Sequence, residues 1–137
     1  MHLLDHVSIG VPDIDLARRF YDAVMAALGA TKVYDRPDAL GYGERCSAND
    51  PESTFLAVYL DSAEVGTSKR HWCFKAASRE QVHAFFEAGL SAGGQPDGDP
   101  GLRPHYHADY YAAFVVDPAG NRIEAVCHAA APGRERP

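Results

Sequence analysis

Residues 6–30 read HVSIGVPDIDLARRFYDAVMAALGA, and residues 71–95 read HWCFKAASREQVHAFFEAGLSAGGQ. A shift of 65 residues, from His6 to His71, aligns the two stretches without a gap and gives five identities over 25 positions. Self-similarity at a fixed spacing indicates a repeated structural unit. The chain therefore contains two copies of one unit, and the order of elements in that unit decides the fold.

Both copies change from the period of a strand to the period of a helix at the same point. Each opens with apolar and polar residues in strict alternation, which predicts a strand. Each continues with an apolar stripe at helical spacing, which predicts an amphipathic helix. The stripe residues are Ala17, Phe20, Tyr21, Val24 and Leu28 in the first copy and Val82, Phe85, Phe86 and Leu90 in the second. Asp13 and the pair Ser78 and Gln81 are suited to cap the two helices, and Gly29 and Gly93 to end them.

More strands are expected after each helix, which makes each unit a βαβββ module. They are expected at 31–34, 40–45 and 54–60 in the first module and at 110–116 and 122–127 in the second. The sequence DPAGN at 117–121 predicts the turn between the last two strands. The Gly- and Pro-rich stretch 94–104 is expected to be mostly loop.

The fold expected from this pattern is α+β. Two βαβββ modules, at about 3–62 and 69–128, would form a curved mixed sheet around a central cavity, with the helices on the outer faces. Residues 1–131 would form a single domain, and 132–137 a frayed tail.

Composition excludes several classes of function. Hydrophobic residues make up 46% and charged residues 23% of the 137 residues, as in globular domains. The net charge of -6 argues against a nucleic-acid partner, and no apolar run is long enough for a membrane span. The N-terminal MHLLDHVSIG lacks the features of a secretory signal, and three cysteines without a CxxC pair indicate reduced thiols. We therefore expect a cytoplasmic protein.

Three residues form a candidate metal site. His6 and His71 occupy equivalent places in the repeat, and both alternate with apolar residues that would pack under the helices. In the last strand, Glu124 alternates with Ile123 and Ala125 and would share the face of the two histidines. Two imidazoles and one carboxylate bind Fe(II), Mn(II), Ni(II) or Zn(II) and leave positions open for a substrate. The alternative is that each is an ordinary polar strand residue, which is the commoner situation for a single histidine or glutamate.

These residues resemble the vicinal oxygen chelate superfamily, which includes glyoxalase I, bleomycin-resistance proteins and extradiol dioxygenases. The resemblance covers about residues 3–128 and is carried by DHVSIGVPD, ARRFYDAVMAALG, HWCFKA and YYAAFVVDPAGNRIEAV. It implies paired βαβββ modules around one divalent metal ion. The ligands implied by the family pattern are His6, His71 and Glu124.

The sequence departs from particular members of that superfamily. Glyoxalase I has a fourth ligand, a glutamate that also acts as the base, on its fourth strand. The 65-residue shift places Tyr59 opposite Glu124, and the neighbours of Tyr59 on that face are Phe55 and Ala57. No carboxylate occurs there, which argues against the usual glyoxalase I mechanism. The potassium-binding loop of the fosfomycin thiol transferases has no match, and extradiol dioxygenases are typically about twice as long.

A polar and aromatic stretch precedes the last hairpin, and it is either a solvated loop or a rim over the metal. In the second case Arg103 would bind a substrate anion and His107 or Tyr111 would move protons, with Tyr59 as a further candidate. His105, Tyr110, Phe55 and Cys73 are candidate substrate contacts. His83 and His128 are expected at the surface.

Two functional hypotheses follow. The first is a metal-dependent lyase, isomerase or dioxygenase that acts on a small molecule with vicinal oxygens, because an ion with three protein ligands can chelate such a pair. The second is a metal-free binding or sequestering protein of the bleomycin-resistance type. A homodimer is expected in either case, and His6 could then belong to a different subunit from His71 and Glu124.

Overall fold

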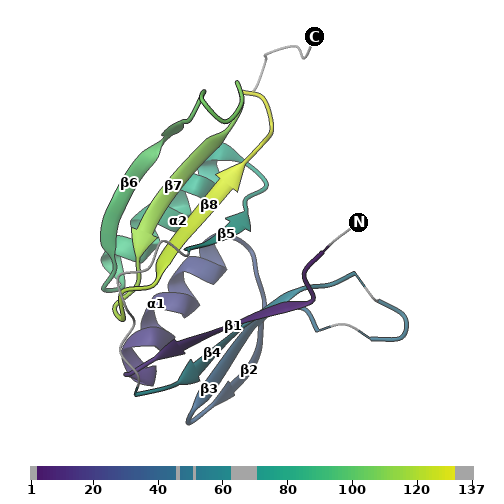
Figure 1. Ribbon diagram of the computed structural model, residues 1–137, viewed down its shortest axis with the longest axis vertical. Coiled ribbons are helices and arrows are strands. Elements are labelled where there is room, and N and C mark those ends of the chain that lie inside the picture. The colour runs from purple at the N-terminus through teal and green to yellow at the C-terminus, as the bar shows by residue number, and fades with distance from the viewer. Residues whose placement is uncertain (1–2, 46, 51, 63–70, 132–137) are drawn as a thin grey trace.

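The computed structural model describes residues 3–45, 47–50, 52–62 and 71–131. Two βαβββ modules follow one another in the chain, as the repeat predicts (Figure 1). The first module consists of β1 (His6–Val11), α1 (Ile14–Ala27), β2 (Lys32–Arg36), β3 (Ala39–Gly43) and β4 (Phe55–Leu60). The second consists of β5 (His71–Lys75), α2 (Arg79–Ser91), β6 (Gln95–Leu102), β7 (Tyr111–Val116) and β8 (Arg122–Cys127). The α+β class and the module order are confirmed.

The modules form two separate four-stranded sheets. The strand orders are β1-β4-β3-β2 and β5-β8-β7-β6, and the first two strands of each order are parallel. No strand of one module is hydrogen-bonded to a strand of the other in these sheets. The two sheets are therefore not joined into one curved sheet within the chain.

The helices lie together between the two sheets (Figure 1). The Asp13 carboxylate accepts from the backbone N–H groups of Asp15 and Leu16, and the Ser78 hydroxyl accepts from that of Gln81. These bonds satisfy N–H groups that have no partner within the helix, so both predicted caps are confirmed. One apolar core includes buried residues of both modules, among them Phe20, Phe85 and Val115. Each sheet thus has a helix-covered face and an opposite face, which we call the open face.

Buried polar contacts join the two modules. The Tyr21 hydroxyl of α1 donates to the Asp117 carboxylate in the β7–β8 turn at 2.5 Å, and both residues are almost completely buried. The same carboxylate accepts from the side-chain amide of Asn121, which also donates to the carbonyl of Gly10 at the end of β1. These bonds lie beside the shared apolar core, so the modules have one fixed relative position.

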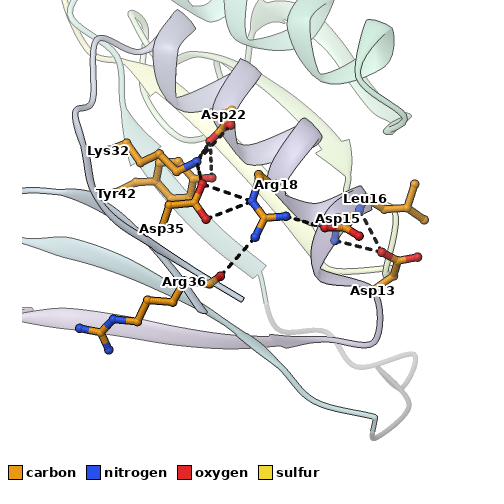
Figure 2. Close-up of polar contacts among 9 residues, drawn as sticks. All are labelled: Asp13, Asp15, Leu16, Arg18, Asp22, Lys32, Asp35, Arg36 and Tyr42. Atoms are coloured by element: carbon orange, nitrogen blue, oxygen red, sulfur yellow. Dashed lines mark hydrogen bonds and ion pairs between the residues drawn. The ribbon is translucent and has the colours of Figure 1, made fainter. Parts of the chain in front are cut away.

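A surface charge network joins α1 to β2 (Figure 2). The Arg18 guanidinium donates to the carboxylates of Asp15 and Asp35, and the Lys32 ammonium contacts Asp22 and Asp35. The hydrogen bond from Lys32, followed by that from Arg18, holds the pKa of Asp35 below its ordinary value. The network therefore fixes the outer edge of the first sheet against its helix.

Three expectations need correction or lie beyond the described residues. Stretch 94–104 is largely strand β6 and not loop, because its backbone pairs with β7 despite two register shifts near Gly98. A bulge of this kind lets a Gly- and Pro-rich segment pair at a sheet edge. The expected tail 132–137 lies outside the described residues, as does Cys46. No helix in the described part of the chain is long and apolar enough to cross a membrane.

Candidate functional site

The site centres on Glu124, on the open face of the second sheet. Glu124 is only 2% exposed, and both of its carboxylate oxygens have a partner. One lies 3.1 Å from Nε2 of His71, and the other accepts from the Tyr110 hydroxyl at 2.5 Å. Burial of a carboxylate costs free energy because the group loses its hydration, and the hydrogen bonds to His71 and Tyr110 offset part of that cost.

Strand register explains why these residues meet. Cys73 is paired with Glu124 across β5 and β8, and Phe114 is paired with Glu124 across β8 and β7. Paired residues point to the same face of a sheet, and His71 is two residues before Cys73. The alternation of apolar residues in β5 and β8 therefore correctly predicts the shared face of His71, Cys73 and Glu124.

Cys73 lies against this carboxylate. Desolvation, followed by the negative charge and hydrogen bond of Glu124, raises the pKa of the Cys73 thiol to about 12. A thiol with such a pKa is protonated at neutral pH and is a poor nucleophile. Cys73 is therefore suited to line the site and not to attack a substrate.

Tyr110 is the hydroxyl donor to Glu124, a role that the sequence does not reveal. Desolvation and the hydrogen bond to Glu124 raise the pKa of the Tyr110 phenol above its ordinary value. The phenol therefore keeps its proton and remains a donor at neutral pH. Tyr110 is brought to the site by a tight turn, in which its N–H donates to the carbonyl of His107.

Two histidines, His107 and His128, contact the ring of Tyr110. The ring of His107 lies edge-on to Tyr110, with ring centroids 5.5 Å apart. Nδ1 of His107 accepts from the N–H of Asp109, and Nε2 of His107 lies 2.9 Å from Nδ1 of His128. His107 is thus near the site but has no contact with Glu124 that the structure shows.

Arg103 also belongs to the open face of the second sheet. Its guanidinium donates to the carbonyls of Gly101 and Asp99 and lies 5.5 Å from the ring centroid of Phe114. Because Phe114 is paired with Glu124, Arg103 stands close to the carboxylate side of the site. The ring of His105, farther along the same loop, lies tilted against that of Tyr106, with the ring centroids 4.2 Å apart.

His6 lies on the other sheet. It belongs to the open face of the first sheet, where its ring stacks on Phe55 at 4.8 Å and its Nδ1 contacts the Asp5 carboxylate at 2.6 Å. Figure 1 shows β1 and β8 diverging from the turn that joins β7 to β8, so that the start of β1 points away from β8. Among the described residues, no group of three or more His, Cys, Asp and Glu side chains could hold a metal ion. The structure therefore brings together His71 and Glu124 but not His6.

Two of the candidate acid–base residues do not face Glu124. Tyr111 is paired with Cys127 on the helix-covered face, where its hydroxyl bonds Nε2 of His83 at 2.6 Å. The alternation that brings Glu124 to the open face directs Tyr111 away from it. Tyr59 is on the open face of the first sheet with His6, and its side chain shares a hydrogen bond with Tyr34.

The residue of β4 that is equivalent to Glu124 lies two positions before Tyr59, the residue expected from the repeat. His6 is paired with Phe55 and His71 with Arg122, so Ala57, and not Tyr59, occupies the place equivalent to Glu124. The connection before β4 differs in length from that before β8, which shifts the register. The described residues of β4 still offer no carboxylate on the open face.

A profile of the Glyoxalase/Bleomycin resistance protein/Dioxygenase superfamily matches residues 3–125. The chain belongs to this superfamily. No curated protein matches the chain significantly.

Solved structures of the superfamily have the same fold. A glyoxalase/bleomycin resistance protein from Albidiferax ferrireducens is 28% identical with a TM-score of 0.77, covering 91% of this chain and 98% of its own. A glyoxalase/bleomycin resistance protein/dioxygenase family enzyme from Burkholderia phytofirmans is 18% identical with a TM-score of 0.67, with the same coverage of both chains. A glyoxalase I mutant from Zea mays is 20% identical with a TM-score of 0.61, covering 90% of this chain but 45% of its own. The last two comparisons concern the fold alone.

Members of the superfamily typically bind a divalent metal ion, and the candidate ligands in this chain are of residue types that bind such an ion. Two imidazoles and a carboxylate are the right donors, and the face around His71 is open. Within one chain, however, only His71 and Glu124 are adjacent. A three-ligand set therefore requires a histidine from elsewhere.

Proposed function

We propose that this superfamily member is a divalent-metal-dependent enzyme that acts on a small molecule with vicinal oxygens, and that two copies of the chain complete each site. The observation that carries the proposal is the buried Glu124 carboxylate beside His71 on an open sheet face. Desolvation of a carboxylate is best offset by a nearby cation, and a divalent ion would supply that charge. The ion would be Fe, Mn, Ni or Zn.

The fixed position of the two modules supports a site between subunits. The hydrogen bond between Tyr21 and Asp117 and the packing of Phe20 against Gly89 and Gly94 join the modules. A Cβ at Gly94 would lie 2.6 Å from the Phe20 ring, so the two modules pack closely at this point. This close packing favours a fixed position of the two modules, in which His6 stays on a different sheet from Glu124 of its own chain. In a two-fold dimer, the open face with His6 can instead meet the partner's open face with His71 and Glu124.

The chain's own residues would prepare such a site. A divalent ion held by His6, His71 and Glu124 would act as a Lewis acid on the two oxygens of a substrate. Tyr110 holds one oxygen of Glu124 and thereby orients the carboxylate, as second partners of metal ligands commonly do. Arg103, beside Phe114, offers a cation to an anionic substrate group.

The test joins oligomeric state to metal content. Sedimentation analysis and plasma mass spectrometry of the purified chain are expected to show a dimer with about one metal ion per chain. His6→Ala and Glu124→Ala are each expected to remove most of the metal while the dimer persists. A monomer, or full metal content in both variants, would contradict the proposal.

One observation favours a second candidate, a ligand-binding protein without turnover. The Glu124 carboxylate already has a partner on each oxygen from its own chain. A carboxylate with these two partners is stable without a cation. A metal-free binding protein of this superfamily would need its carboxylate to be stabilised in this way. If reconstitution with Fe, Mn, Ni and Zn gave no bound metal, this candidate would replace the first.

A further inference from the structure

Unpaired cations gather on the open faces of both sheets. Arg36, Arg45, Lys75 and Arg103 form no ion pair with a carboxylate of residues 3–45, 47–50, 52–62 and 71–131. By contrast, Arg18 and Lys32, on the helix side of the first sheet, are paired with aspartates. Cations that no carboxylate of these residues neutralises thus lie on or beside the faces where the substrate would lie, in a chain of net charge -6.

Two of these cations, Arg36 and Arg45, lie over aromatic rings. The Arg36 guanidinium lies 4.7 Å from the ring centroid of Tyr34, and that of Arg45 lies 5.7 Å from Tyr34 and 5.5 Å from Phe55. Figure 2 shows the Arg36 side chain extending away from the charge network, to which only its carbonyl belongs. We call Tyr34, Arg36, Arg45 and Phe55 the arginine platform.

The backbone makes room for this platform. Tyr34 is paired with Gly41, and a Cβ at Gly41 would lie 2.4 Å from the Tyr34 ring. Only glycine lets that ring lie flat across the sheet. The small residues Gly41 and Ala57 form the floor beside it. The sequence pattern does not reveal this surface, because Gly41 and Tyr34 lie outside the histidine motifs.

We propose that the arginine platform binds the anionic end of the substrate, and that the substrate is a small organic acid with a flat, apolar or aromatic part. A guanidinium stacked on a ring keeps its N–H edge free to bind a carboxylate with two parallel hydrogen bonds. A flat group would pack against the exposed ring edges of Tyr34 and Phe55 and against the guanidinium planes of Arg36 and Arg45.

The platform adjoins the candidate metal ligand. His6 stacks on Phe55, and the Arg45 guanidinium also lies against the Phe55 ring. An acid held by Arg45 would therefore lie near His6. The unpaired Arg103 and Lys75 would add positive charge from the partner's face. This inference rests on the proposed function in that it treats the platform as one half of the substrate site.

Benzoate binding to the full-length, metal-free chain tests the inference. Removal of metal with a chelator prevents the carboxylate from binding a metal ion instead of an arginine. Titration calorimetry would compare benzoate with benzamide, which has the same shape without the charge, and with acetate, which lacks the ring. Arg36→Gln and Arg45→Gln would be compared with Arg19→Gln, which removes one positive charge from α1, where Arg19 donates to the Ser91 carbonyl.

Benzoate is expected to bind more tightly than benzamide or acetate. Arg36→Gln and Arg45→Gln should each weaken benzoate binding about tenfold, the effect of losing a charged hydrogen-bond partner, while Arg19→Gln changes it less than about twofold. Absence of benzoate binding, equal binding of benzoate and benzamide, or equal effects of Arg19→Gln and Arg45→Gln would overturn the inference.

The two proposals can fail separately. Metal content and oligomeric state test the metal site and do not depend on the platform. If benzoate binds as expected, but the purified chain is a monomer or takes up no metal on reconstitution, the proposed function alone is refuted. A metal-loaded dimer without benzoate preference would refute the platform alone.

Discussion

Glu124 carries a carboxylate in a position that water hardly reaches. His71 and Tyr110 replace its hydration, and Cys73 lies against it with a protonated thiol. The alternation in β8 predicts that Glu124 shares a face with His71. It does not predict Tyr110, because that residue reaches Glu124 from a loop whose turn no strand pattern reveals.

Tyr110→Phe should destabilise the fold. The substitution removes the donor to one buried carboxylate oxygen, and an unsatisfied buried polar group costs about 1–3 kcal/mol. Urea denaturation would measure the loss. Tyr106→Phe is the matched control, since Tyr106 is exposed on the same loop and should change stability by less than about 0.5 kcal/mol. Equal losses in the two variants would show that the bond to Glu124 contributes nothing.

Cys73 should react slowly with iodoacetamide although it lies at the surface. The ordinary pKa of a cysteine thiol is 9.0, so an unperturbed thiol is half ionised at pH 9.0. In the metal-free chain the pKa of the Cys73 thiol is about 12, and little of it is ionised at that pH. Alkylation at that pH, followed by peptide mass spectrometry, should be at least about tenfold slower in the folded chain than in urea. Glu124→Gln should speed the reaction because it removes the negative charge. A rate that Glu124→Gln leaves unchanged would contradict this account.

The elements differ in how well the sequence predicts them. Helices α1 and α2 and strands β1, β5 and β8 are confirmed because each has its own period and its own caps or turns. Strand β6 is missed because its pairing comes from β7 and not from its own Gly- and Pro-rich sequence. The register of β4 is missed by two residues, because loop length and not residue type sets it.

The ion pairs between α1 and β2 should make the folding stability depend on pH in the acidic range. The pKa of Asp35 is lowered in the folded chain, chiefly by Lys32, so its contribution is present above the ordinary pKa of 3.8. That contribution is lost as the pH falls through the lowered pKa of Asp35, because the carboxylate is then protonated in the folded state as well as in the unfolded state. Asp35→Asn should therefore be less stable than the unmodified chain at about pH 7, and the difference should shrink at about pH 3. A difference independent of pH would exclude an ionic role for Asp35.

The two modules behave as one body because polar and apolar contacts join them. The sequence reveals the repeat but not the relative position of its two copies. That position depends on close packing between Phe20 and the glycines of the second module, and on the bond from Tyr21 to Asp117. This is why His6, His71 and Glu124 share equivalent faces yet do not meet within one chain.

Tyr21→Phe should weaken both modules together. The change leaves a buried Asp117 oxygen with one donor fewer and should cost about 1–3 kcal/mol, with a single unfolding transition retained. Tyr106→Phe, at an exposed position, is the control. Hydrogen exchange would show whether β1 and β8 lose protection equally. Loss of protection in one module only would contradict a shared core.

The most direct test of the central claim is the metal content of mixed dimers. His6→Ala and Glu124→Ala chains would each be purified, and then unfolded and refolded together in equal amounts with the metal. If the site lies between subunits, a mixed dimer has one intact site, and random pairing restores about one quarter of all sites. Recovery of about that much metal, with almost none in either variant alone, is the result we predict. No recovery in a preparation that contains mixed dimers would show that the three residues do not form a site between two subunits.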